Sequence, residues 1–194
     1  MFTAPRTLPL ISSLALWGLL ASVPQTALGH GAQPVIRGSA RLDAAVTSSN
    51  GGAQQRCLND GSGGLTVCAS FNATDTSFGI ALGDVDGDGD LDAVVTSNSD
   101  PDQRCLNDGS SGFTNCVSFN TILDNTRSIA LGDVNGDGYL DALLANNGYN
   151  EQRCLNDGSG RFANCASFNT DDYSYGIALG DVNGDGYLDA LLAN

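Results

Sequence analysis

The sequence predicts an all-β protein assembled from repeated units of four short antiparallel strands. Three observations lead to this class. Glycine accounts for 25 of the 194 residues, and 21 Asp stand against a single Glu, a composition that suits turns and short strands better than helices. Two blocks of sequence recur three times, at a period of 48 to 49 residues. Within each period, runs of apolar and β-branched residues end at turn motifs rich in Asn, Asp and Gly.

The first 29 residues are predicted to be a secretory signal peptide. Arg6 supplies a positive charge, the apolar stretch 8–20 follows it, and 27–29 offers small residues for cleavage. The stretch is shorter than the roughly 20 residues that a membrane-spanning helix needs, and no later segment is apolar enough to span. We therefore expect a domain of residues 30–194, with no membrane span, that is secreted, held at the cell surface or kept in the periplasm.

The charge of the chain excludes several partners and chemistries. Eight Arg and no Lys stand against 22 acidic residues, for a net charge of −14, which is unsuited to nucleic acid or an anionic membrane. His30 is the only histidine, so the body of the domain cannot form a zinc hydrolase site or a Ser-His-Asp triad. The remaining candidates for catalysis are the aspartates Asp100, Asp102, Asp171 and Asp172. Acidic turns of this kind are usually solvated surface, so we expect no enzymatic activity.

The repeat contains two recurring blocks. The first, Gln-Arg-Cys-Leu-Asn-Asp-Gly-Ser, occurs at 55–62, 103–110 and 152–159. The second, Ala-Leu-Gly-Asp-Val-(Asp/Asn)-Gly-Asp-Gly, begins at Ala81, Ala130 and Ala178. A unit of this size cannot bury its own apolar face, so we expect the repeats to stack and share a core.

Each period contains four predicted strands. The first precedes an Asp/Gly loop, at 78–85, 127–134 and 175–182, and the second follows it, at 91–97, 140–146 and 188–194. The third and fourth flank the Asn-Asp-Gly-Ser turn, as at 103–106 and 113–119, because this turn supplies residues that tolerate a positive φ. Four strands per period predict a β-propeller-like array of four-stranded antiparallel blades.

The six cysteines are predicted to form three hairpin disulfides. Cys57 and Cys68 are 11 residues apart, and the centre of the hairpin between them falls inside the predicted turn. Their sulfurs would then face each other on adjacent strands, and export to an oxidising compartment favours the bond. Metal binding by these thiols is the alternative, but the spacing lacks the close cysteine pairs of structural zinc sites. The equivalent pairs are Cys105 with Cys116 and Cys154 with Cys165.

The Asp/Gly loops at 84–92, 133–141 and 181–189 are the candidate metal sites. Short oxygen-bearing side chains alternate along each loop, and two glycines let the chain curl so that several oxygens converge on one point. Ca²⁺ accepts about 6 to 8 oxygen ligands in flexible geometry, which suits such a loop better than the strict octahedron of Mg²⁺. The alternative is a set of polar turns that bind no metal. The candidate ligands, at loop positions 1, 3, 5, 7 and 9, are Asp84, Asp86, Asp88, Asp90, Asp92; Asp133, Asn135, Asp137, Tyr139, Asp141; and Asp181, Asn183, Asp185, Tyr187, Asp189.

Position 7 indicates which atom would bind the cation, and position 12 separates the loop from other calcium motifs. Position 7 is Asp90 in the first loop but tyrosine in the other two, so we expect it to ligate through its backbone carbonyl. An EF-hand or dockerin-type loop needs an acidic residue at position 12 and a following helix. Position 12 is apolar in all three loops: Val95, Leu144 and Leu192. The residues that follow the first loop are largely β-branched, so a strand is favoured there and both alternatives are disfavoured.

The Asp/Gly loops and the segments that flank them resemble a known family. The Asp-x-(Asp/Asn)-Gly-Asp-Gly-x-x-Asp loop, preceded by the segments 78–81 or 175–178 and followed by Leu-Asp-Ala, is similar to the FG-GAP repeat of integrin α-subunits and many secreted bacterial proteins. The resemblance covers nearly all of 35–194 and implies a β-propeller with Ca²⁺ between the first two strands of each blade, serving ligand binding or adhesion. Two features depart from the family: Arg127-Ser128 replaces the aromatic-Gly pair, and paired cysteines are not a general feature of it.

The predicted propeller is incomplete. Residues 35–43 align with the first loop, but only Asp43 remains at a ligand position, so this copy should bind no calcium. Two complete blades and two partial ones fall short of the roughly 4 to 8 blades of a propeller. Either C-terminal blades follow in a longer protein, or the chain completes its ring by self-association.

The favoured function is a secreted calcium-binding repeat module that mediates extracellular binding or adhesion to a protein or a glycan. One alternative is a purely structural or self-assembling repeat segment of a larger surface protein. The other is a non-catalytic accessory part of a carbohydrate-active enzyme.

Overall fold

The computed structural model describes residues 33–37, 41–46, 52–72, 76–109, 112–120, 125–169 and 173–194. The predicted signal peptide at 1–29 lies outside these residues, as do Asp171 and Asp172. The described part of the chain is built from strands joined by turns, which confirms the all-β class. None of its residues belongs to a helix that is long and apolar enough to cross a membrane.

The strands form four antiparallel sheets, which we call blades 1 to 4. In each blade the strands pair in their order along the chain. Blade 1 comprises β1 (Gln33–Arg37), β2 (Arg41–Val46), β3 (Gln54–Asn59) and β4 (Leu65–Asn72). Blade 2 comprises β5 (Ser77–Gly83), β6 (Asp92–Ser97), β7 (Gln103–Asn107) and β8 (Phe113–Ser118). Blade 3 comprises β9 (Thr126–Gly132), β10 (Asp141–Asn146), β11 (Glu151–Asn156) and β12 (Phe162–Asn169). Blade 4 contains β13 (Gly176–Gly180) and β14 (Asp189–Ala193).

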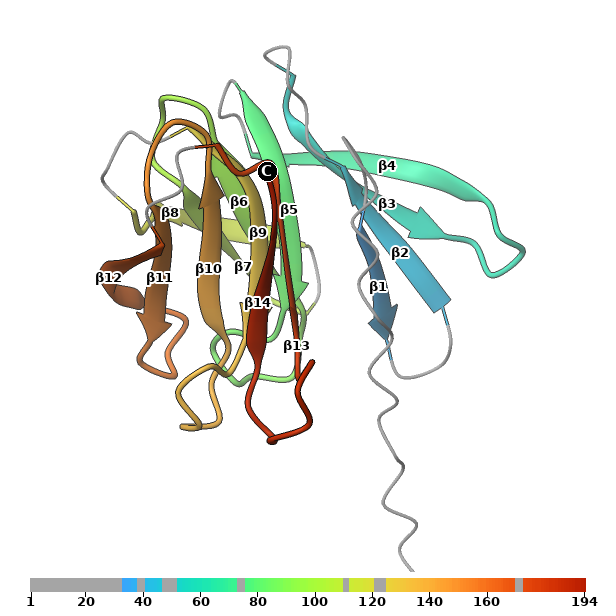
Figure 1. The fold of residues 1–194 in the computed structure, drawn as a ribbon. Coiled ribbons are helices and arrows are strands. Elements are labelled where there is room, and N and C mark those ends of the chain that lie inside the picture. Colours follow the sequence, from blue (N-terminus) through green and yellow to red (C-terminus); the bar gives the residue numbers. More distant parts are fainter. Residues whose placement is uncertain are drawn as a thin grey trace, which may run out of the picture.

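Consecutive blades pack face to face and share apolar clusters, as the repeat predicts (Figure 1). Alternate residues of a strand point to opposite faces, so a strand such as β6 is buried along its whole length between two neighbouring blades. Val94 faces blade 3 in a cluster with Ile129 and Leu144. Val95, the next residue, faces blade 1 in a cluster with Ala45.

The glycine before each of the first two Asp/Gly loops allows the blades to approach one another. A Cβ placed on Gly83 of blade 2 would lie 2.6 Å from Leu140 Cδ1 of blade 3. A Cβ on Gly132 of blade 3 would lie 2.7 Å from Leu188 Cδ1 of blade 4. Real Cβ atoms are not found this close to another carbon, so the leucine of each following blade occupies the space that a side chain would fill.

The predicted disulfides are confirmed. Cys57 bonds Cys68, and the two residues are direct partners across β3 and β4. The bonds Cys105–Cys116 and Cys154–Cys165 join the corresponding outer strands of blades 2 and 3, and each pair has a Cα–Cα distance of 4.0 Å. No free cysteine remains among the described residues, so the alternative of a thiol metal site is wrong.

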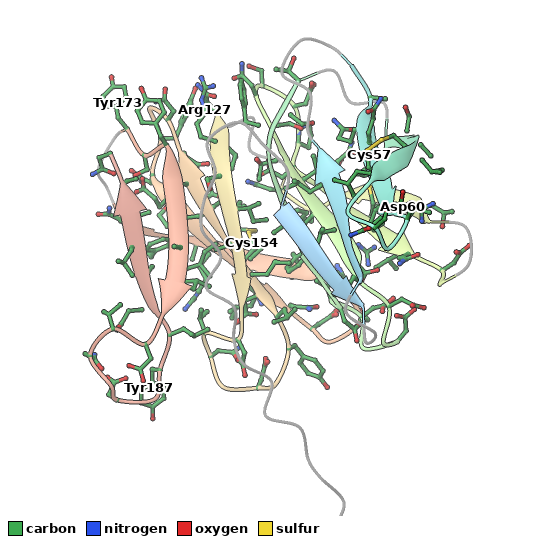
Figure 2. All side chains as sticks on the ribbon, turned by 90° about the vertical axis from the view of Figure 1, so that its right-hand side faces the viewer. Cys57, Asp60, Arg127, Cys154, Tyr173 and Tyr187 are labelled. Carbon is green, nitrogen blue, oxygen red and sulfur yellow. A yellow bond between two sulfur atoms is a disulfide. The ribbon has the colours of Figure 1, made fainter. Side chains whose placement is uncertain are left out.

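The meander places two kinds of loop at the same end of each blade. The Asp/Gly loop joins the first strand to the second, and the Asn-Asp-Gly turn joins the third to the fourth, so both lie at the ends where the first and third strands finish. Figure 2 shows Tyr187 of the β13–β14 loop at this end, and Arg127 and Tyr173 at the opposite end. Segments about 15 to 25 residues apart in sequence therefore meet at one end of the array.

Candidate metal centres

The first aspartate of each Asp/Gly loop folds the loop back on itself. The strand stops at Gly83, and Asp84 accepts hydrogen bonds from the backbone N–H of Gly87 (2.8 Å) and of Gly89 (2.9 Å). The second loop repeats this geometry, with Asp133 accepting from Gly136 (2.7 Å) and Gly138 (2.8 Å). The third loop repeats it at Asp181, with Gly184 (2.6 Å) and Gly186 (2.9 Å) as donors.

Glycine is required in these loops by backbone conformation, because φ is +80° at Gly87 and +91° at Gly89. A Cβ would meet no atom within 4 Å at either position, so steric space is not the reason. The two left-handed glycines alternate with Asp86, Asp88 and Asp90 and let the loop curl.

The first loop gathers three carboxylates. Asp84, Asp86 and Asp88 each offer an oxygen atom, and these oxygens all lie within 4.8 Å of one another. The donor set is purely oxygen and carries three negative charges, which suits a hard divalent cation such as Ca²⁺. The cluster corresponds to positions 1, 3 and 5 of the predicted site, so the local pattern of the sequence identified these residues.

The second and third loops use an amide at position 3. Asn135 donates through Nδ2 to Asp137 Oδ2 (2.8 Å), and its Oδ1 accepts from the N–H of Asp137 (2.8 Å). Asn183 and Asp185 form the same pair in the third loop, at 3.1 and 2.8 Å. The amide replaces one of three negative charges, so carboxylate repulsion is smaller in these loops than in the first.

The hydrogen bonds of the first aspartate affect its acidity. Donation from the N–H of Gly138, the largest cause, and from Gly136 and its neighbours lowers the pKa of the Asp133 carboxyl below its ordinary value, against the raising effect of burial. The N–H of Gly186 has the same effect on the pKa of Asp181. Both residues are therefore anionic at neutral pH, the state that a cation requires.

The aspartate at position 9 binds two backbone groups. Asp92 is fully buried, and it accepts from the N–H of Val85 (3.0 Å) and of Asn107 (2.8 Å). Its pKa is raised to about 6: burial is the largest cause and the charges of Asp86 and Asp88 add to it, while the two backbone donors act to lower the pKa. Asp92 thus lies outside the group of three converging carboxylates and connects the metal loop to the Asn-Asp-Gly turn.

The same connection recurs in the other blades. Asp141 accepts from Val134 (3.3 Å) and from Asn156 (2.9 Å), and burial raises its pKa. Asp189 accepts from Val182 (3.0 Å) and is only half-buried. Blade 4 has no third strand among the described residues, so no turn asparagine meets Asp189 there.

Position 7 directs its side chain to the neighbouring turn. A Cβ on Gly158 would lie 2.5 Å from the ring of Tyr139, and one on Gly109 would lie within reach of the Asp90 carboxylate. Both glycines belong to the Asn-Asp-Gly turn of the same blade. These side chains therefore pack on the turn, which leaves the backbone carbonyl of position 7 for the ligand role that the sequence predicts.

The turn asparagines contact the candidate metal loops, and the sequence reasoning did not single them out. Asn156 Nδ2 donates to the carbonyls of Leu140 (3.0 Å) and of Val85 (2.8 Å), so it contacts the metal loops of its own blade and of the preceding one. Asn107 donates to Leu91 O (3.1 Å) within blade 2. The recurrence of this asparagine at a fixed distance from the cysteine is the available signal, but turn formation alone accounts for that pattern.

The matching family model follows these loops. A family model described as FG-GAP-like repeat matches residues 84–144 and 133–192, which together cover more than half of the chain. The chain belongs to the FG-GAP-like repeat family. Both matches of this FG-GAP-like protein begin at the first aspartate of an Asp/Gly loop, at Asp84 and Asp133, and end within the second strand of the next blade, so each match spans one structural repeat together with the next Asp/Gly loop.

A solved structure supports the fold assignment. The V. cholerae biofilm matrix protein Bap1 matches 84% of this FG-GAP-like chain with a TM-score of 0.50 and 17% sequence identity. The match covers 23% of the Bap1 chain, so this chain spans about a quarter of the length of that protein. The similarity confirms an array of propeller-like blades. No curated protein matched the sequence.

Proposed function

We propose that this chain is an extracellular calcium-binding repeat module. The observation that carries the proposal is the convergence of Asp84, Asp86 and Asp88 within 4.8 Å, in a loop whose backbone geometry recurs twice more. Its three disulfides favour an oxidising location, and its structural neighbour Bap1 is a biofilm matrix protein. Carboxylate and carbonyl oxygens of a flexible loop favour Ca²⁺ over Mg²⁺.

Some residues of each loop would bind the cation, and others position the loop. In the first loop, Asp84, Asp86 and Asp88 would supply carboxylate oxygens, and position 7 would add its carbonyl. Asp92 holds the start of the loop through the N–H of Val85 and holds the adjacent turn through Asn107. A bound cation would neutralise the clustered charge and fix the loop end of the blade. We therefore propose that the metal stabilises the loop end of the blade.

Extracellular binding of a protein or a glycan is the second part of the proposal. Tyr139 and Tyr187, at the loop end, are 46% and 73% exposed. Aromatic rings with a polar hydroxyl are enriched where proteins contact partners, because they bury a large apolar area and still form a hydrogen bond. We therefore place the contact surface at the loop end of the array.

Catalysis receives little support from the described aspartates. Asp102 is buried, and its carboxylate accepts from the N–H of Ser97 (2.9 Å) and from Thr126 Oγ1 of the next blade (3.1 Å). Its role is thus structural. Asp100 is exposed to solvent, as expected of an acidic surface turn.

Isothermal titration of the metal-free protein with CaCl₂ tests the proposal. We expect a saturable binding isotherm in which the Asp88→Ala variant loses the first-loop site. Asp100→Ala, an exposed aspartate outside the loops, is the matched control and should bind as the wild type does. An isotherm that shows no calcium binding, or that Asp88→Ala leaves unchanged, contradicts the proposal. A glycan array probed in calcium and in chelator tests the second part separately.

A further inference from the structure

The outer turn of blade 3, residues 156–160, lies between the first and the second Asp/Gly loop. We call this segment the blade-3 turn. On one side of it, a Cβ on Gly160 would lie 3.3 Å from Asp86 Cβ of the first loop. On the other side, a Cβ on Gly158 would lie 2.5 Å from the ring of Tyr139, at position 7 of the second loop. The turn therefore touches a candidate ligand residue of each loop.

Asn156 divides the two hydrogens of its side-chain amide between the loops. Its Nδ2 donates to the carbonyl of Val85 (2.8 Å) in the first loop and to that of Leu140 (3.0 Å) in the second. Its Oδ1 accepts from the N–H of Gly158 (3.1 Å), and the residue is buried. An amide carries two N–H donors, so each loop holds one of them. Because the group is buried, a loop that moves away leaves a donor without a partner, which is costly.

The first loop is fixed to blade 3 at Val85. This residue lies between Asp84 and Asp86, two of the three converging carboxylates. Its N–H donates to Asp92 (3.0 Å), and its buried side chain shares an apolar cluster with Phe162, at the start of β12. Any change in the backbone between the two carboxylates therefore alters the contacts of the first loop with the outer hairpin of blade 3.

The second loop is fixed to the same turn near its end. Leu140, whose carbonyl accepts from Asn156, directly follows Tyr139, the residue expected to ligate through its backbone carbonyl. Asp141 comes next, is fully buried, and accepts from the N–H of Asn156 (2.9 Å). The position of Asn156 thus determines how the last three residues of the second loop are held.

The corresponding asparagine of blade 2 bonds only within its own blade. Asn107 donates through Nδ2 to Leu91 O (3.1 Å) and through its N–H to Asp92 (2.8 Å). Its Oδ1 accepts from the N–H of Gly109 (3.2 Å). The two asparagines therefore share every contact within a blade, and the bond to Val85 distinguishes Asn156 from Asn107.

We propose that Asn156 couples the first and the second calcium site, so that occupation of either loop raises the affinity of the other. This coupling rests on the proposed function, calcium binding by the loops, and adds its regulation. Three carboxylates within 4.8 Å repel one another, which favours a more open first loop when no cation is bound. Occupation removes that repulsion and fixes the Val85 carbonyl, which positions the Asn156 amide and with it the end of the second loop. By linkage, the effect is equal in the two directions.

Isothermal calcium titration of proteins with one or two intact loops tests the proposal. Asp185→Ala removes the third site and leaves a two-loop protein. Adding Asp137→Ala leaves the first loop alone, and adding Asp88→Ala instead leaves the second loop alone. We define the coupling ratio as the product of the two binding constants of the two-loop protein divided by the product of the two single-loop constants. We expect a coupling ratio of at least about five.

The same three proteins are then compared with and without the asparagine. Asn156→Ala should bring the coupling ratio close to one, because the two loops no longer share an amide. Asn107→Ala is the matched control, since it removes the same group and the same bonds within a blade, and it should keep the ratio. A ratio of one in the proteins that retain Asn156 overturns the proposal. A ratio that persists in Asn156→Ala, or that Asn107→Ala abolishes equally, also overturns it.

Hydrogen exchange provides a second measurement that does not depend on the folding of Asn156→Ala. In the protein that retains only the first loop, calcium should slow the exchange of the blade-3 turn, whereas the turn of blade 1, residues 59–64, should exchange at an unchanged rate. Equal exchange of the blade-3 turn with calcium and with chelator overturns the coupling. Single-loop proteins that bind calcium with a coupling ratio of one contradict the coupling alone. Single-loop proteins that bind no calcium contradict the proposed function as well.

Discussion

The guanidinium carbon of Arg127 lies 4.0 Å from the centroid of the Phe78 ring. Phe78 is on β5 of blade 2, and Arg127 is on β9 of blade 3. Arg127 holds the repeat position that is aromatic in Phe78 and Tyr175, and it departs there from the family pattern. The contact explains that departure, because arginine at this position stacks on the aromatic residue of the preceding blade.

The stack predicts an energetic coupling between the two blades. Arg127→Ala and Phe78→Leu should each lower stability, and the double variant should lose less than the sum of the two. The coupling free energy is expected to be about 0.5–1 kcal/mol, in line with cation–π pairs that are partly exposed. Urea unfolding of the four proteins measures it. A strictly additive double variant would show that the contact contributes nothing.

Packing at Gly83 predicts a position-specific cost of adding one methyl group. Gly83→Ala places a Cβ against Leu140 and Leu131 of blade 3, so we expect a loss of about 1–3 kcal/mol from overpacking. Gly180→Ala is the same change at the same repeat position, but it meets open space. Thermal melts of dilute protein should separate the two variants. Equal thermal midpoints for the two variants would contradict the prediction that Gly83 is needed for the close approach of blades 2 and 3.

Calcium is expected to raise the thermal midpoint, and a chelator to lower it. A ligand that binds only the native state stabilises by about 2.7 kcal/mol at a concentration a hundredfold above its dissociation constant. Asp137→Ala should reduce the calcium-dependent increment by removing one site. Tyr139→Asp introduces the residue that the first loop has at position 7 and should keep the increment, since that position would ligate through its carbonyl. An unchanged melt in excess chelator contradicts the prediction.

Burial of Asp92 predicts how the stability of the metal-free protein depends on pH. Its pKa is raised from 3.8 to about 6 on folding, so the native state binds the proton more tightly than the unfolded state does. The stabilisation of the folded state by Asp92 is therefore fully present below about pH 3.8 and is lost as the pH rises through 6. Asp133 and Asp181, whose pKa values are lowered, stabilise the folded state above about pH 3.8, and this stabilisation is lost only as the pH falls below that value.

Urea midpoints in chelator at pH 4.5 and pH 7 measure this dependence. Asp92→Asn should flatten the difference between the two midpoints, although it also lowers both by weakening the bond to Val85. Asp100→Asn, at an exposed site, should leave the difference as it is in the wild type. A wild-type protein that becomes less stable between pH 6 and pH 4.5 would contradict the assignment of the raised pKa.

Local features of this fold were predictable from the sequence because short-range chemistry determines them. The turn residues of Asn-Asp-Gly-Ser and the spacing of Cys57 and Cys68 fix each outer hairpin, and the alternating aspartates fix the metal loop. The strand ends differ from the prediction by about two residues, since Asp84 and Val85 already belong to the loop.

Contacts between blades were not predictable, because they depend on how the sheets stack. Asn156 reaches the carbonyl of Val85, 71 residues earlier in the chain, and no local pattern marks that pair. The packing of Leu140 on Gly83 is of the same kind. Likewise, the sequence places Asp92 in the metal loop, but only the assembled blade shows that its carboxylate holds the turn at Asn107.

The placement of the three disulfides has a consequence for proteolysis. Each bond joins the two strands on either side of an Asn-Asp-Gly turn, and Asp60 and Asp157 of those turns are exposed to solvent. A protease that cuts one of these turns would leave both new ends covalently linked through the neighbouring cystine (Figure 2). The damaged blade would thus keep its outer strand, and the cut would separate fragments only after reduction.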